Sequence, residues 1–251
     1  MGQYDGILLM TDFDGTLAIK GKVSPENSVA IKHFQDNGGV FVLASGRIPK
    51  FLNENQHPFT ITKYAVMLNG TIICEDNGKT IVERFPLAFE TFDFIDRVII
   101  PNFPKLNFIR YYTYDRFFDV KLDGIRGEEI LNSPIYKIIL NTPTELSDEY
   151  LENITKVCYG KYAISRSWPN GIEFQAWGST KGDAVARLKK LYGSRAETVI
   201  AAGDYENDVT MIQAADIGYA VGNAKDALKK VADRITVPCE EHAIARIIEE
   251  I

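Results

Sequence analysis

The chain has few of the features that mark extracellular or membrane proteins. Among its 251 residues are only three cysteines, Cys74, Cys158 and Cys239, which lie far apart and form no C-x-x-C pair. This spacing argues against a disulfide framework or a zinc site and favours buried thiols in a reducing cytosol, so we predict a cytoplasmic protein. No apolar run approaches the roughly 18 residues that cross a bilayer. The first residues also lack the positive segment of a signal peptide.

Positive charge is not in excess either. The chain carries 28 Lys and Arg against 34 Asp and Glu, a formal net charge of −6. Without a general basic surface, we expect neither nucleic acid nor an anionic membrane as a partner. Repeats and low-complexity segments are also missing from the sequence. Its length allows one large domain or two modest ones.

One stretch near the N-terminus combines an apolar run with two carboxylates. Ile7 to Met10 predicts a buried strand, and Asp12 and Asp14 follow it, with Gly15 next. Strand geometry would place both carboxylates on one face. Two like charges at the end of a buried strand are costly unless a cation lies between them or one is protonated. Taken alone, this short motif is equally compatible with a surface turn.

Alternating strands and helices fill the two ends of the chain. Ser24, Pro25 and Glu26 predict a helix start, and Gly38 with Gly39 its end. This alternation favours an α/β fold with a parallel sheet and right-handed crossovers. The predicted strands span 7–10, 40–44, 64–68, 198–202, 217–221 and 235–237.

The middle of the chain follows another pattern. From about residue 80 to 177 it is rich in aromatic residues and alternates between apolar and polar positions. We predict strands at 107–114, 135–140 and 171–177 and a helix at 145–157. Such alternation is typical of an antiparallel sheet with one wet face. We interpret the segment as an inserted α+β domain, the alternative being one continuous domain with an antiparallel edge.

Four carboxylates follow predicted strands of the parallel sheet. Asp12 and Asp14 come after one strand, and Asp204 and Asp208 after another. The carboxyl ends of parallel strands share one edge of the sheet, where ligands bind. Converging carboxylates need a cation, and ligation by oxygen alone suits Mg²⁺.

Further polar residues occupy similar places. Ser45 and Gly46 follow a strand and offer a hydroxyl and an approachable amide, and Lys181 stands at a helix start that favours anions. Each alone has an ordinary explanation, a turn for Ser45-Gly46-Arg47 and a solvated surface side chain for Lys181. Together they suit a phosphoryl group surrounded by a carboxylate nucleophile, a metal, a hydroxyl and a lysine.

These segments resemble the four motifs of the haloacid dehalogenase (HAD) superfamily of aspartate-nucleophile phosphohydrolases. The similarity is closest to the Cof-type (subclass IIB) sugar phosphatases, whose C2B-type α+β cap is inserted between the second and third motifs. The matching segments are Asp12-Phe13-Asp14-Gly15-Thr16, Leu43-Ala44-Ser45-Gly46-Arg47, Ser179-Thr180-Lys181-Gly182 and Gly203-Asp204-Tyr205-Glu206-Asn207-Asp208. The resemblance implies a Rossmann-like HAD core at 1–82 and 178–251 and a cap that sets substrate specificity at 83–177.

The resemblance also implies roles for individual residues. Asp12 would be the nucleophile and Asp14 the general acid and base. The ligands of Mg²⁺ would be Asp12, Asp204 and the backbone carbonyl of Asp14, with Asp208 in support. The phosphate group would be bound by Ser45, Gly46, Lys181 and Asn207. Candidates for substrate contact are Arg47, Arg110 and Tyr112, and more broadly the cap residues Tyr114, Lys137, Arg166, Trp168 and Trp177.

We therefore predict a Mg²⁺-dependent phosphatase of small phosphorylated metabolites, sugar phosphates above all, that acts through an aspartyl-phosphate intermediate. A phosphomutase or phosphotransferase on the same scaffold is an alternative. A receiver-type signalling domain would use similar residues but is normally near half this length. A non-enzymatic phosphate-binding module would not need both Asp12 and Asp14. We expect a monomer or weak homodimer.

Overall fold

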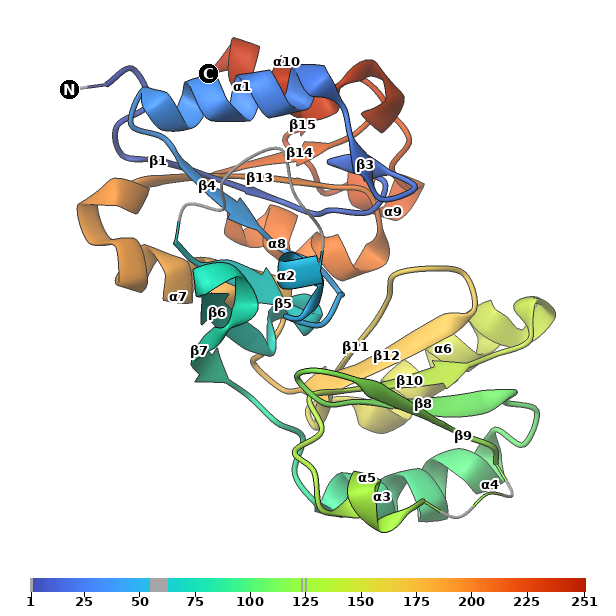
Figure 1. The fold of residues 1–251 in the computed structure, drawn as a ribbon. Helices are drawn as coiled ribbons and strands as arrows, with labels where there is room; N and C mark the ends of the chain where they lie inside the picture. The colour runs from blue at the N-terminus through green and yellow to red at the C-terminus, as the bar shows by residue number, and fades with distance from the viewer. Residues whose placement is uncertain (1, 55–62, 123, 125) are drawn as a thin grey trace.

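The computed structural model describes residues 2–54, 63–122, 124 and 126–251. Figure 1 shows a larger unit that contains both chain termini and a smaller unit, green to yellow, built from the middle of the chain. No helix within the described ranges is both long and apolar enough to cross a membrane.

The larger unit is built around a five-stranded parallel sheet with the order β15-β14-β13-β1-β4. Its strands are β1 (Ile7–Thr11), β4 (Val40–Leu43), β13 (Thr198–Gly203), β14 (Ile217–Ala220) and β15 (Arg234–Ile235). Strands β1 and β4 are nearly continuous apolar runs because helices cover both faces of the sheet. The predicted α/β fold with a parallel sheet is confirmed.

Helices α1 (Pro25–Asp36) and α10 (Ala243–Glu250) pack on one face, where Phe34 and Ile247 meet Leu9 of β1. Helices α7 (Lys181–Tyr192) and α8 (Val209–Ala214) cover the other face, where Leu188 and Met211 meet Met10. The shorter elements of this unit are β2 (Ala18–Ile19), β3 (Lys22–Val23), α2 (Phe51–Glu54) and α9 (Asp226–Lys229).

The third predicted strand of the parallel sheet lies elsewhere. Strand β5 (Ala65–Met67) pairs antiparallel with β6 (Ile72–Glu75), which pairs with β7 (Thr80–Arg84) in a separate three-stranded sheet. One parallel bridge, between Ala44 and Val66, joins β5 to the end of β4. The predicted strand and its parallel contact with β4 are therefore present, but its main pairing is antiparallel, because a short apolar run does not specify the direction of its partners. The predicted boundary after residue 82 falls inside β7.

The smaller unit, which we call the cap, carries a five-stranded antiparallel sheet with the order β11-β12-β10-β8-β9. The helices α3 (Glu90–Phe94), α4 (Ile100–Asn102), α5 (Glu128–Leu131) and α6 (Ser147–Cys158) belong to the same segment. The predicted strands correspond to β8 (Phe108–Tyr112), β10 (Lys137–Asn141) and β12 (Gly171–Ala176). Strands β9 (Phe117–Val120) and β11 (Tyr162–Arg166) were not predicted.

The alternation predicted that one face of the cap sheet is exposed to solvent. In the structure, the centre of this polar face is buried. Ile138 and Phe174 point into the apolar core of the cap, while Lys137, Glu173 and Gln175 alternate with them and are also buried. Their partners are in the larger unit: Gln175 Nε2 donates to the carbonyls of Leu68 and Asn69 at 3.3 and 3.0 Å. Apolar–polar alternation therefore marked a surface that packs against a second layer.

Two helix starts depend on side-chain caps. Thr180 Oγ1 accepts from the backbone N–H of Asp183 at 3.2 Å, and Asp183 accepts from the backbone N–H of Thr180 at 2.8 Å. Ser24 caps α1 in the simpler way, by accepting from the backbone N–H of Asn27. We expect Thr180→Ala and Ser24→Ala each to lower the free energy of unfolding by about 1 kcal/mol, because one backbone donor loses its partner. Urea unfolding measures both losses, and unchanged midpoints would refute the assignment of these caps.

Candidate active site

Neighbouring strands of the parallel sheet bring the predicted carboxylates together. Strand β1 runs directly into Asp12, whose backbone N–H donates to the carbonyl of Ala202 on β13 at 2.9 Å. Strand β13 in turn ends at Gly203, immediately before Asp204. Pairing of β1 with β13 thus places the two carboxylates at the same edge of the sheet.

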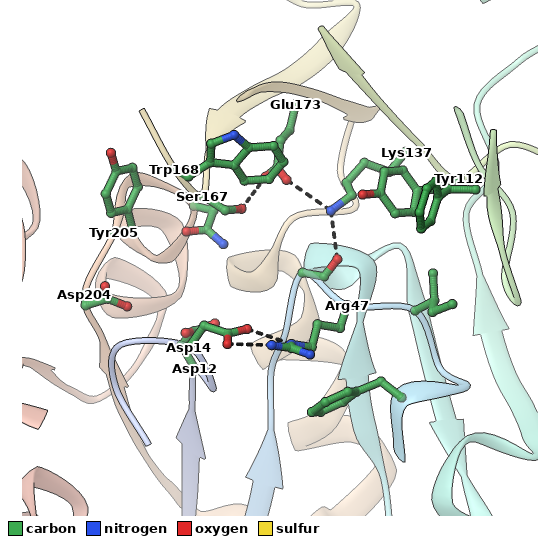
Figure 2. A pocket seen from close by; sticks show the side chains of 15 residues that line it. Asp12, Asp14, Arg47, Tyr112, Lys137, Ser167, Trp168, Glu173, Asp204 and Tyr205 are labelled. Atoms are coloured by element: carbon green, nitrogen blue, oxygen red, sulfur yellow. Dashed lines mark hydrogen bonds and ion pairs between the residues drawn. The ribbon is translucent and has the colours of Figure 1, made fainter. Parts of the chain in front are cut away.

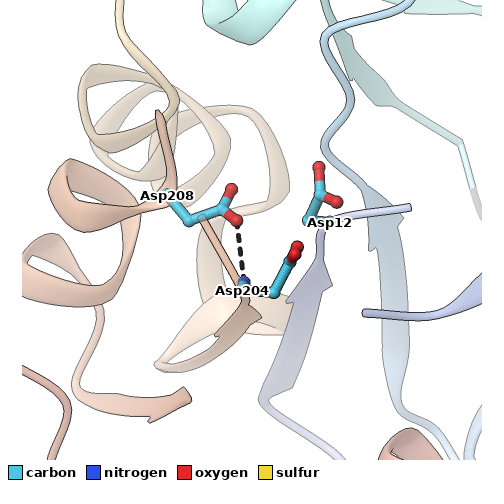
Figure 3. A group of neighbouring side chains, drawn as sticks. All are labelled: Asp12, Asp204 and Asp208. Carbon is cyan, nitrogen blue, oxygen red and sulfur yellow. Dashed lines mark hydrogen bonds between the residues drawn. The ribbon is translucent and has the colours of Figure 1, made fainter. Parts of the chain in front are cut away.

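Asp12, Asp204 and Asp208 form a cluster in which one carboxylate oxygen of each lies within 4.8 Å of the others (Figure 3). Asp208 is fixed by the loop that carries Asp204, because its Oδ2 accepts from the backbone N–H groups of Asp204 and Tyr205 at 3.0 and 3.2 Å. Thr16 Oγ1 donates to Asp204 Oδ1 at 3.0 Å. The chain therefore holds three acidic side chains around one point.

Lys181, the first residue of α7, is fully buried between two of these acids. Its ammonium lies 2.5 Å from Asp12 Oδ1 and 2.6 Å from Asp208 Oδ1. Burial disfavours its charge, but the two carboxylates outweigh burial and raise the pKa of Lys181. The lysine thus stays protonated and neutralises part of the negative charge.

The remaining negative charge fits a divalent cation. Burial, reinforced by the charge of Asp208, raises the pKa of Asp204 to about 7. Burial also raises the pKa of Asp12 well above its ordinary value, although Lys181 opposes this shift. A cation bound among the three carboxylates would relieve this strain, and a set of oxygen donors suits Mg²⁺.

Gly15 allows the loop after β1 to pass close to Asp204. Its φ is +85°, and a Cβ there would lie 2.6 Å from Asp204 Oδ2. Any larger residue would be strained and would push the carboxylate aside. The glycine of the first motif is therefore required by this approach.

Asp14 lies apart from the three-carboxylate cluster and pairs with Arg47. The guanidinium donates from Nε and Nη2 to the two oxygens of Asp14, both at 2.7 Å (Figure 2). The hydrogen bond to Asp14 outweighs burial and raises the pKa of Arg47, which also stacks over Phe51 at 4.3 Å. Both oxygens of Asp14 therefore accept from Arg47, and the two residues form a bidentate ion pair at the floor of the cavity described below.

The predicted phosphate-binding residues surround the same place. Ser45 is buried directly after β4, and its Oγ accepts from the backbone N–H of Arg47 at 3.2 Å. Asn207 Nδ2 donates to Asn69 Oδ1 at 3.1 Å. Gly46 and Asn207 line a cavity next to the acidic side chains, whereas Ser45 and Lys181 lie beneath its surface.

This cavity has a volume of about 440 Å³ and lies between the cap and the larger unit (Figure 2). Asp12, Asp14, Arg47 and Asp204 line its floor, and most of the other lining side chains come from the cap. Its aromatic lining consists of Phe51, Tyr112, Phe117, Trp168 and Tyr205.

The cap candidates divide into two groups. Tyr112, Lys137 and Trp168 line the cavity. Arg110 does not: its guanidinium donates to Asp119 at 2.6 and 2.7 Å and stacks over Phe117, so the expected substrate contact has no support here. Residues engaged elsewhere or exposed are Tyr114, Arg166 and Trp177.

Six of the lining positions were not predicted as site candidates, and these are Ile48, Phe51, Phe117, Ser167, Glu173 and Tyr205. Glu173 offered one signal, because it is a charged residue between Ile172 and Phe174 in a strand. Asn69, just after β5, does not line the cavity. It is buried in the structure and bonds both Glu173 and Asn207.

Comparison with known proteins agrees with this geometry. The profile of the haloacid dehalogenase-like hydrolase family matches residues 9–248. A putative phosphatase of Haemophilus influenzae is 28% identical over 260 residues, covering 96% of this chain and 97% of its own. A 5-amino-6-(5-phospho-D-ribitylamino)uracil phosphatase of Bacillus subtilis is also 28% identical, covering 96% and 94%. A crystal structure of a haloacid dehalogenase-like hydrolase from Bacteroides thetaiotaomicron superposes with a TM-score of 0.77 at 26% identity, covering 99% of both chains.

The chain belongs to the haloacid dehalogenase-like hydrolases. The predicted resemblance to the Cof-type phosphohydrolases is confirmed, as is the prediction of a phosphoric monoester hydrolase. The roles of the individual site residues stay predictions.

The acidic cluster predicts how stability responds to pH and Mg²⁺. Because the pKa of Asp204 is raised to about 7, the folded chain retains a proton that the unfolded chain has lost. The metal-free protein should therefore be most stable in mild acid and lose stability as pH rises through about 7. At pH 8, Mg²⁺ at a hundredfold excess over its Kd should add about 2.7 kcal/mol.

Urea unfolding between pH 5 and 8, in chelator or in Mg²⁺, measures both the pH dependence of stability and the stabilisation by Mg²⁺. Asp204→Asn should weaken the pH dependence and the stabilisation by Mg²⁺. The matched control Asp36→Asn, at an exposed position of α1, should keep both. Equal Mg²⁺ responses in the two variants would contradict the assignment of the cation site.

Proposed function

We propose that the protein is a Mg²⁺-dependent phosphatase of small phosphorylated metabolites, with sugar phosphates as the favoured class, and that it works through an aspartyl phosphate on Asp12. The observation that carries the proposal is the position of Asp12. This carboxylate lines a cavity of about 440 Å³, bonds Lys181 at 2.5 Å and shares its edge of the sheet with Asp204 and Asp208.

In the first step, a carboxylate oxygen of Asp12 attacks phosphorus and the bond to the leaving oxygen breaks. Asp14, released from Arg47 and protonated, gives its proton to the leaving alkoxide. In the second step, Asp14 takes a proton from the water that attacks the aspartyl phosphate, which frees Asp12 and inorganic phosphate.

Several side chains and backbone groups would stabilise the negative charge of the transferred phosphoryl group. The Lys181 ammonium, the Ser45 hydroxyl, the Gly46 amide and the Asn207 amide would surround the phosphoryl oxygens. Mg²⁺ would be held by Asp12, Asp204 and the backbone carbonyl of Asp14, supported by Asp208, and would supply further positive charge to these oxygens. Arg47 would both bind the phosphate dianion and release Asp14, because the dianion competes with Asp14 for the guanidinium.

The cap would contact the leaving group. We propose that residues 83–177 act as this specificity unit over a catalytic unit formed by 1–82 and 178–251. Aromatic side chains of the cavity, such as Tyr112 and Trp168, offer flat apolar surfaces to the faces of a sugar ring or a heterocycle. The Bacillus subtilis relative is named for a substrate with a polyol phosphate chain and a uracil ring. Compounds of both kinds therefore belong in a substrate test.

A phosphatase panel with Mg²⁺ or EDTA tests the proposal. It would contain hexose phosphates, pentitol phosphates, nucleoside monophosphates and an aryl phosphate. Release of inorganic phosphate only in Mg²⁺ supports a hydrolase. A phosphomutase would instead return the phosphoryl group to a second hydroxyl, which time-resolved product analysis detects.

Substitutions of Asp12 and Asp14 should affect the reaction in different ways. We expect Asp12→Asn to form no phosphoenzyme and to lose activity on every substrate. Asp14→Asn should lose about 10²- to 10⁴-fold on alkyl phosphates, because the alkoxide leaves without a proton. An activated aryl phosphate needs less protonation and should lose much less. Steady-state rates on both substrates check this, and equal losses would refute the acid role of Asp14.

Cap substitutions should affect substrates unequally. Trp168→Ala or Tyr112→Ala removes contact with the leaving group, and we expect about a 10- to 150-fold loss in kcat/KM that differs between metabolites. A small aryl phosphate should hardly register the change. Lys181→Ala should damage every substrate, because all share the phosphoryl group. A uniform loss from the cap variants would show that the cap does not select the leaving group.

A further inference from the structure

The junction between cap and core contains an ion pair that is cut off from solvent. Lys137 on β10 and Glu173 on β12 lie 3.0 Å apart, and their side chains are 2% and 0% exposed. Burying two charges is costly and is offset only when hydrogen bonds satisfy both groups. The pair also lines the cavity, although the mechanism above gives it no task.

Lys137 reaches across the junction to the loop that carries Ser45. Its Nζ donates to the carbonyl of Gly46 at 2.8 Å. The N–H of the same peptide unit belongs to Arg47 and donates to Ser45 Oγ at 3.2 Å. The C=O and N–H of a trans peptide point in opposite directions. A lysine of the cap thus fixes the orientation of the peptide that holds the serine hydroxyl.

Glu173 makes a parallel connection to Asn207. Its Oε2 accepts from Asn69 Nδ2 at 2.6 Å and from Ser167 Oγ at 2.7 Å. Asn69 Oδ1, at the other end of the same amide, accepts from Asn207 Nδ2 at 3.1 Å. Because an amide has donors on one side and an acceptor on the other, the bond to Glu173 decides that Asn69 presents oxygen to Asn207.

The two connections converge at Gly46. A Cβ on this residue would lie 2.9 Å from Asn69 Oδ1 and 3.5 Å from Lys137 Nζ, so a side chain would separate the groups. The absence of a side chain lets cap and core approach at this point.

We propose that Lys137 and Glu173 are positioning residues, which hold the phosphate-binding side chains Ser45 and Asn207 in place through Gly46 and Asn69. This inference rests on the proposed phosphate roles of Ser45 and Asn207. It makes the affinity for the phosphoryl group itself depend on a docked cap. The cap then contributes to binding every substrate, in addition to selecting the leaving group.

The test is a double variant, Lys137→Met with Glu173→Gln. Removing both charges together leaves no uncompensated ion, and the glutamine oxygen can still accept from Asn69. We expect the Ki of inorganic phosphate as a competitive inhibitor, and the KM of a small aryl phosphate, to rise about tenfold. If Lys137 and Glu173 had a purely structural role, the double variant would contain a smaller fraction of active molecules. Its apparent kcat would then fall, and its Ki for phosphate would stay unchanged. An unchanged Ki overturns the inference.

Combining the double variant with Ser45→Ala tests whether Lys137 acts through Ser45. If Lys137 acts through Ser45, the double variant should change Ki by less than about twofold once the serine hydroxyl is gone, because effects on one shared path are not additive. Full additivity overturns the inference and leaves the proposed function intact. If Ser45→Ala alone leaves Ki unchanged, the proposed phosphate role of Ser45 is wrong and the inference fails with it.

The connection from Glu173 through Asn69 to Asn207 is tested with a separate variant, Asn69→Gly. Asn69 has φ of +59°, which glycine tolerates, so Asn69→Gly removes the amide with little backbone strain. Its effect on Ki should vanish in the Asn207→Ala background, and additive effects would overturn this part. Arg126→Met is the control, since it breaks another ion pair of the cap, in which Arg126 is 15% and Asp96 44% exposed. Its Ki should equal that of the unaltered protein, and a tenfold rise there would also overturn the inference.

Discussion

The buried ammonium of Lys181 is the interaction on which the rest of the site depends. It bonds Asp12 and Asp208, which come from loops after two different strands. Without this charge, three carboxylates would face one another at the floor of the cavity, at a cost that the fold would avoid by protonation or by moving apart. The capping box of α7 holds the lysine by fixing the helix start one residue earlier, at Thr180.

A second buried cation, Lys137, has a comparable role at the junction of the two units. It joins cap to core by donating to the Gly46 carbonyl, and within the cap it pairs with Glu173. The two lysines pair with different carboxylates. Lys181 balances the charges of Asp12 and Asp208 in the acidic cluster, while Lys137 balances Glu173, which accepts from the amide of Asn69. Both are sequestered from water, so their hydrogen bonds are strong and geometrically demanding.

Much of the site was predictable because its residues lie in short local patterns. An apolar strand followed by Asp12 and Asp14 predicts where the carboxylates lie, since parallel strands end at a common edge. Lys181 was predictable from its helix start. In contrast, the bonds that Lys137 and Glu173 make to Gly46 and Asn69 join segments whose relative position no local pattern specifies. The same limit explains β5, whose apolar residues fit either a parallel or an antiparallel partner. Glu173 was missed because a charged residue in a strand normally faces water.

The pairing of β1 with β13 has a consequence for how the chain folds. Ile7 pairs with Thr198, so the β1–β13 ladder closes a loop that contains the entire cap. Closing a long flexible loop costs more entropy than closing a short one. The cap sheet pairs segments much closer in sequence, such as Tyr112 with Phe117. Once formed, it shortens the effective loop that the parallel sheet must close. Folding rate should therefore be limited by the late joining of the two halves of the core, with the inserted unit acting as an early nucleus.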